Sequence, residues 1–71
     1  MALTPEEIEN RFTYHPPTQE KIEQHQAIRD AAKELCILIN AVCPDSREKS
    51  TSLTKLDEVV FHANAAIARH D

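Results

Sequence analysis

The stretch LCILINAVCPDS, residues 35–46, decides the fold. It opens with an unbroken apolar run at residues 35–39 and ends in Pro44-Asp45-Ser46. A proline disfavours helical backbone at the residue before it, whereas Asp and Ser favour turns and helix N-caps. We therefore expect one helix to stop before Pro44 and another to start at Asp45 or Ser46. Two helices joined by so short a turn lie antiparallel, which predicts a helical hairpin.

The sequences on both sides of this turn have helical periodicity. Before it, apolar residues recur mostly every three or four positions, and Thr18 is a suitable N-cap, which predicts a helix from about Thr18 to Val42. After it, the same spacing predicts a helix that continues almost to His70. The apolar positions are Ile22, Ile28, Ala32, Leu35, Ile39 and Val42 in the first helix, and Leu53, Leu56, Val60, Ala63 and Ile67 in the second.

A short helix precedes the hairpin. Thr4 is a suitable N-cap, Pro5 suits the first turn, and Glu7 stands at the capping-box position. The chain has no Gly and is rich in helix-forming residues. We predict an all-α fold and a single domain of residues 1–71, in which residues 1–17 form the short helix and a loop rich in aromatic residues and proline, and residues 18–71 form the long antiparallel hairpin.

The apolar surface of the hairpin exceeds what one partner helix can cover. A single packed neighbour covers a stripe of about 100°, but residues 35–39 are apolar all round. Val59 and Phe61 also lie off the main stripe of the second long helix. We therefore predict that the chain assembles with its own copies as a homo-oligomer.

Composition argues against several classes of partner. The net charge is −4 and there is no block of Lys and Arg, which disfavours polymeric nucleic acid as a partner and a DNA-regulating role. No apolar run is long enough to span a membrane, and the N-terminus resembles no signal peptide, so we expect a soluble protein that stays in the cytoplasm.

Metal binding and catalysis are also disfavoured, so we predict no cofactor, no metal and no enzymatic activity. The histidines form no i, i+4 pair, no CxxC motif occurs, and the hydroxyl residues form no nucleophile motif. Cys36 and Cys43 are seven residues apart, roughly 10 Å along a helix, which is too far for a disulfide. We expect both to be small buried apolar side chains.

The loop RFTYHPPT, residues 11–18, is the first candidate ligand-binding element. Two prolines stiffen it, and Tyr14, His15 and Pro16 project from an extended segment beside positive charge. A preorganised aromatic ring next to cations can stack on a flat ring while a neighbour binds an anion. The alternative is that Phe12 and Tyr14 close the end of a small core.

The second candidate element is cationic. Arg29 flanks the apolar stripe of the first long helix, one turn before Lys33, and can serve a crevice at a helix interface. The alternative is an Arg29 paired with a surface carboxylate.

A further candidate anion site lies near the start of the next helix. Its residues, which suit a phosphate, are Arg47, Lys49, Ser50 and Thr54, although ordinary solvated residues would look the same. Arg69 lies near the last carbonyls, where a cation favours the helix dipole.

Several segments together resemble one family, the small phage anti-CBASS cyclic-oligonucleotide sponges, whose helical hairpin is shared with one class of Thoeris anti-defence sponge. The resemblance covers about residues 10–70. It rests on RFTYHPPT at 11–18, IRDAA at 28–32, CPDSREKS at 43–50, LTKLDE at 53–58 and NAAIAR at 64–69.

The resemblance implies a homohexamer that sequesters cyclic di- and trinucleotide messengers such as cGAMP without cleaving them, in the cytoplasm of an infected bacterial host. Cyclic dinucleotides would lie between two protomers, and cyclic trinucleotides where three protomers meet. The stacking tyrosine of the family falls on Tyr14 and its phosphate-binding residue on Arg29, with Arg69 reaching a base or phosphate. From charge, we expect the trinucleotide at Arg47, Lys49 and the nearby hydroxyls. The rival hypothesis from another class is an oligomeric helical protein-interaction module with no nucleotide ligand.

Overall fold

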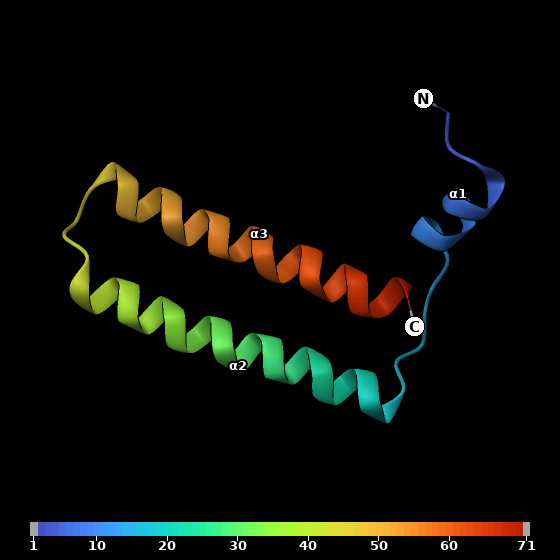
Figure 1. Ribbon diagram of the computed structural model, residues 1–71, viewed down its shortest axis with the longest axis horizontal. Helices are drawn as coiled ribbons and strands as arrows, with labels where there is room; N and C mark the ends of the chain where they lie inside the picture. The colour runs from blue at the N-terminus through green and yellow to red at the C-terminus, as the bar shows by residue number, and fades with distance from the viewer. Residues whose placement is uncertain (1, 71) are drawn as a thin grey trace.

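The computed structural model describes residues 2–70 and consists of three helices (Figure 1). Helix α1 is Pro5–Phe12, α2 is Gln19–Val42 and α3 is Arg47–Arg69. The described part contains no strand, which confirms the all-helical prediction. Met1 and Asp71, the ends of the predicted domain of residues 1–71, lie outside the described residues.

The helices begin where their N-cap residues predict. Thr4, Thr18 and Ser46 each have an extended backbone and accept a hydrogen bond on the side-chain oxygen from the main-chain N–H three residues later, at 3.1, 3.2 and 3.1 Å. Of the two residues expected to cap α3, Ser46 is the one that does so. Local sequence chemistry therefore sets all three helix starts.

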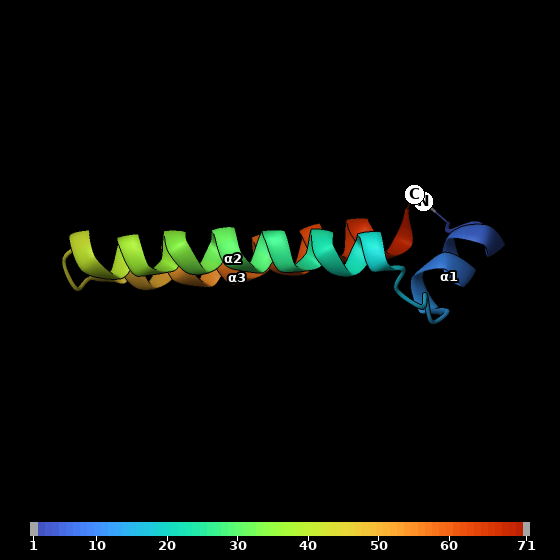
Figure 2. The same ribbon diagram turned by 90° about the horizontal axis from the view of Figure 1, so that it is seen from below.

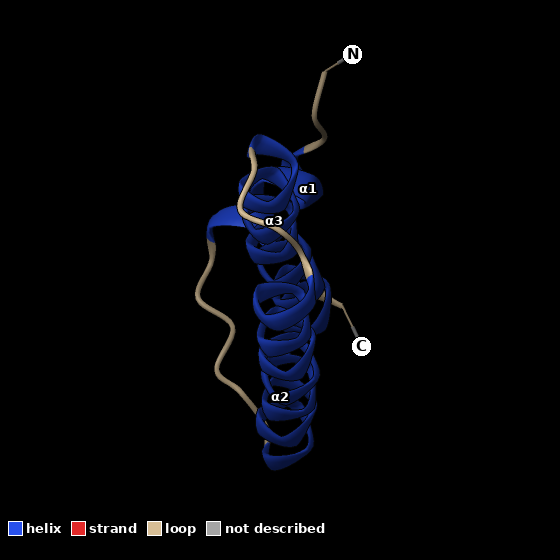
Figure 3. Ribbon diagram, turned by 90° about the vertical axis from the view of Figure 1, so that its left-hand side faces the viewer, coloured by secondary structure: helices blue, strands red, loops and turns tan. Residues whose placement is uncertain are grey.

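Helices α2 and α3 form the antiparallel hairpin, and α1 lies beyond its open end (Figures 1 and 2). Seen end-on, α2 and α3 make a single layer (Figure 3). The molecule measures 46 × 34 × 14 Å, so its thickness is close to that of one helix with its side chains. One layer of helices has two open faces, and no side chain among residues 2–70 is fully buried.

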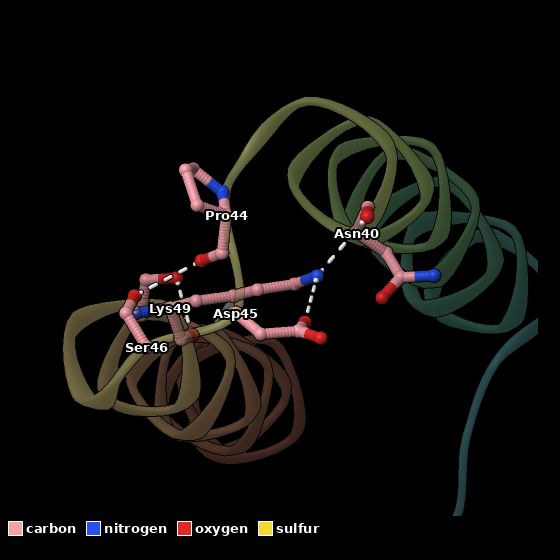
Figure 4. A network of polar contacts seen from close by, with 6 residues as sticks. Asn40, Pro44, Asp45, Ser46 and Lys49 are labelled. Atoms are coloured by element: carbon pink, nitrogen blue, oxygen red, sulfur yellow. Dashed lines mark hydrogen bonds and ion pairs between the residues drawn. The ribbon is translucent and has the colours of Figure 1, made fainter.

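Polar contacts join the two long helices at both ends of the hairpin. Near the open end, His25 Nδ1–H donates to Asn64 Oδ1 at 2.9 Å. At the turn, the Lys49 ammonium donates to the main-chain carbonyl of Asn40 at 3.1 Å (Figure 4). These contacts add to the partial apolar burial that holds α2 against α3.

Large apolar side chains remain on the surface of the chain. Phe12 is 82% exposed, Phe61 73% and Ile37 60%. The expected burial of the cysteines is wrong for the single chain: Cys36 is exposed and Cys43 is half-buried, because a two-helix layer is too thin to cover side chains beside the contact line. Both thiols are free.

Candidate functional site

A groove of about 350 Å³ runs between α2 and α3 and carries two cations. Arg29 and Lys33 come from successive turns of α2, and α3 contributes one carboxylate, Asp57. The rest of the lining is apolar and consists of Ala32, Cys36, Leu53, Leu56 and Val60. A flat ligand with negative charge at its edge matches this combination of an apolar floor and a cationic side.

The two cations of the groove have no hydrogen bond or ion pair with any other residue in the described range 2–70. Arg29 is therefore not the surface-paired arginine that the sequence left open as an alternative. By contrast, Lys55 pairs with Glu58 at 3.3 Å. The guanidinium of Arg29 is available to an anionic ligand.

A second groove, of about 200 Å³, lies on the other side of the line where the helices touch. It shares Ala32, Leu56 and Val60 with the first groove. Its other lining residues each come one position before a residue of the first groove, and this step around the helix places them on the opposite face. Those residues are Ile28, Ala31, Leu35 and Val59. One face of the hairpin thus carries the cationic groove, and the other carries an apolar groove.

The aromatic loop, residues 13–18, joins α1 to α2 and lies away from the cationic groove. Tyr14 is 79% exposed and Pro16 is exposed, whereas His15 is half-buried with its ring Nε2 2.7 Å from the carbonyl oxygen of Asn10. Phe12 and Tyr14 do not close a core in the single chain, so the alternative role considered for them is wrong there. Tyr14 instead presents its ring to the surroundings.

One chain does not bring the predicted dinucleotide residues together. Arg29 is ten residues after Gln19, or roughly 15 Å along the axis of α2, and Tyr14 does not line the groove. Arg69 ends α3 at the open end of the hairpin, where it lines a small pocket with Glu7, Asn10, Arg11 and His70. Arg29 in the groove is therefore separated on the same chain from both Tyr14 and Arg69.

The residues expected to bind a cyclic trinucleotide do not line one common pocket either. Arg47 lines a shallow pocket with Glu48, Thr51 and Ser52. The Lys49 side chain is only 11% exposed, and its ammonium lies 3.1 Å from both the Asn40 carbonyl and the Asp45 carboxylate.

The predicted hydroxyls, those of Ser50 and Thr54, are exposed but do not line this pocket. Thr51, one turn after Arg47, does line it, and sequence reasoning overlooked it although the i, i+4 spacing was the available signal.

Residues 2–70 provide neither a metal site nor a membrane-spanning helix. No group of three or more His, Cys, Asp and Glu lies close enough to hold a metal ion. No helix in this range is long and apolar enough to cross a membrane.

Comparison with known families gives one match that spans most of the chain. The family described as Acb2/Tad1, hairpin domain, matches residues 4–68. This region includes α1, the aromatic loop, α2 and nearly all of α3. No curated protein and no solved structure shows a significant match.

Proposed function

The chain belongs to the Acb2/Tad1 hairpin family, and on that premise we propose that it is a phage anti-defence protein that sequesters cyclic oligonucleotide messengers. It binds cyclic di- and trinucleotides such as cGAMP without cleaving them. It thereby blocks CBASS signalling in the cytoplasm of the infected bacterium. The protein acts by mass action, because every messenger molecule it holds is withheld from the receptor.

The observation that carries this proposal is the pair of unpartnered cations in the groove. Arg29 and Lys33 have no partner within residues 2–70, and they lie beside an apolar floor. In the bound state they hold a phosphate, and Tyr14 of another copy stacks on a base. His15 and Pro16 frame that tyrosine, and Arg69 approaches the ligand from a hairpin end.

The separation of Tyr14 from Arg29 within one chain supports a site shared between copies. A cyclic dinucleotide has two bases and two phosphates related by an approximate two-fold axis. An interface between two identical copies supplies each group twice. Stacking contributes about 1–3 kcal/mol per base and a charge-assisted contact about 1.5–3 kcal/mol, so the duplicated set contributes about 5–12 kcal/mol, and the upper end of this range corresponds to nanomolar affinity in a preformed site.

The thin shape of the chain supports assembly, which we propose is a homohexamer. Exposed Ile37, Val59 and Phe61 leave apolar surface on a molecule 14 Å thick, and other copies cover it. The cyclic trinucleotide binds where three copies meet, near the start of α3. Arg47 is the principal cation of this second site. Its other proposed ligand-binding residues are Lys49, Ser50 and Thr54.

Calorimetric titration with 3′,3′-cGAMP tests the proposal. We expect tight binding, and intact ligand recovered after the protein is denatured. Cleaved ligand would instead indicate an enzyme. Absence of binding by an assembled protein would favour the helical interaction module, and a protein that sediments as a lone 8.1 kDa chain would remove the shared site.

A further inference from the structure

We infer that His15 is a positioning residue that fixes Tyr14 by binding the last turn of α1 through Nε2, and that this nitrogen does not contact the ligand. The test of this inference has two parts. The affinity measurement rests on the proposed function, whereas the measurement of Tyr14 mobility uses the free protein and does not.

The first observation is the short contact between the His15 ring and α1. Nε2 lies 2.7 Å from the carbonyl oxygen of Asn10, and the side chain is half-buried. A carbonyl oxygen can only accept, so Nε2 carries the hydrogen and donates it. This nitrogen is therefore engaged within the chain and is not available to a phosphate or a base.

The second observation is that the Asn10 carbonyl is one of the acceptors left without a main-chain donor at the end of α1. In a continuing helix, the Asn10 carbonyl would accept from the N–H of residue 14, but α1 ends at Phe12. The imidazole takes the place of that donor. The preceding carbonyl, that of Glu9, accepts from the Thr13 N–H at 3.0 Å, and the Thr13 hydroxyl donates to the Glu9 carboxylate at 2.9 Å.

Tyr14 thus lies between two residues that are both fastened to the last turn of α1. Thr13 is anchored before it and His15 after it, and Pro16 and Pro17 restrict the backbone that follows. The ring itself is 79% exposed and gains little from packing in the single chain. The backbone position from which the ring projects therefore depends on these two side-chain contacts. A tyrosine held this way loses less conformational entropy when a base stacks on it.

The composition of the chain supplies a direct probe. Tyr14 is the only tyrosine and there is no tryptophan, so intrinsic fluorescence reports on this residue alone. Time-resolved anisotropy and acrylamide quenching of the free protein then measure how freely the Tyr14 ring moves and how accessible it is. No ligand is needed for this measurement.

We compare the parent with His15→Ala, His15→Gln and the control His62→Ala. Gln also has its side-chain nitrogen at the ε position and can donate to the Asn10 carbonyl, but it lacks the imidazole ring. In the free protein we expect faster depolarisation for His15→Ala only, whereas quenching should change little because the ring is already 79% exposed in the parent. With 3′,3′-cGAMP, we expect His15→Ala to bind about five- to tenfold more weakly and His15→Gln to approach the parent.

Two outcomes would overturn the inference. One is unchanged Tyr14 mobility in His15→Ala. The other is an equal loss of affinity in His15→Ala and His15→Gln, which would mean that the imidazole contacts the ligand. A parent protein that binds no cyclic dinucleotide would defeat the proposed function while the fluorescence comparison still decides the role of His15.

Discussion

The ammonium of Lys49 lies 3.1 Å from the main-chain carbonyl of Asn40, so a side chain from the first turn of α3 binds the last turn of α2 (Figure 4). The same ammonium lies 3.1 Å from the Asp45 carboxylate. The end of α2 has no cation of its own, since its last turn contains no basic residue. Lys49 supplies the positive charge that favours a helix C-terminus, and it closes the hairpin.

Replacing Lys49 is therefore expected to destabilise the hairpin. Lys49→Met keeps most of the aliphatic stem but loses the hydrogen bond to Asn40, and we expect a loss of about 1–2 kcal/mol in the free energy of unfolding. Urea denaturation at fixed protein concentration measures it. Asp45→Asn is the control and should unfold like the parent, because the carboxylate is fully exposed. Equal stability of Lys49→Met and the parent would show that the contact is only incidental.

The sequence predicted those features that depend on neighbouring residues. Thr4, Thr18 and Ser46 begin the helices because the capping hydroxyl and its N–H partner are only three residues apart. The contact between His25 and Asn64 joins residues 39 positions apart, and no local pattern indicates it. Which residues face each other across the hairpin depends on how the two helices are rotated about their axes.

The same distinction applies to the candidate site. The sequence placed Arg29 at the edge of the apolar stripe, one turn from Lys33, and the structure finds both in one groove. It did not indicate that Asp57 lines that groove, because Asp57 comes from the opposite helix. Nor did it indicate that Lys49 turns toward Asn40 while Arg47 lines a separate pocket.

Tyr14→Ala and Arg29→Ala are each expected to abolish dinucleotide binding and leave the assembly intact. Each change acts twice in a two-fold site, so a loss of 1–3 kcal/mol per contact weakens binding at least about 30-fold. Titration with 3′,3′-cGAMP, together with sedimentation, measures both effects. Tyr14→Phe, which preserves stacking, and Arg29→Lys, which preserves charge, should retain much of the affinity. A mutant to Ala that binds like the parent would remove that residue from the site.

Removing the groove carboxylate should have the opposite effect. Asp57 lines the same groove as Arg29 and Lys33, so its negative charge opposes an incoming phosphate. We expect Asp57→Asn to bind 3′,3′-cGAMP about two- to fivefold more tightly at low salt, and the gain should shrink as salt is added. Asp30→Asn makes the same charge change on α2 outside the groove and should have little effect. Weaker binding by Asp57→Asn would mean that the carboxylate positions a cation or contacts the ligand.

The pocket at the start of α3 makes a separate prediction. The side chain of Arg47 has no hydrogen bond or ion pair within residues 2–70. We expect Arg47→Ala to weaken binding of cyclic tri-adenylate at least about tenfold, because losing even one of the charge-assisted contacts that three copies supply has that effect, and to leave 3′,3′-cGAMP binding unchanged. Lys55→Ala removes an exposed cation that pairs with Glu58 and serves as the control. Parallel loss of both ligands would show that the two sites are not independent.

Val59 provides a test of assembly, because it is 59% exposed in the single chain and lines the apolar groove. Glu is a good helix former, so Val59→Glu should remain helical. If another copy covers this groove, the new carboxylate is either buried without a partner or forces the copies apart. We therefore expect Val59→Glu to sediment as smaller species than the parent at micromolar concentration. His62→Glu introduces the same side chain at an exposed position outside the groove and should sediment like the parent. Identical sedimentation of both variants would place the interface between copies elsewhere on the hairpin.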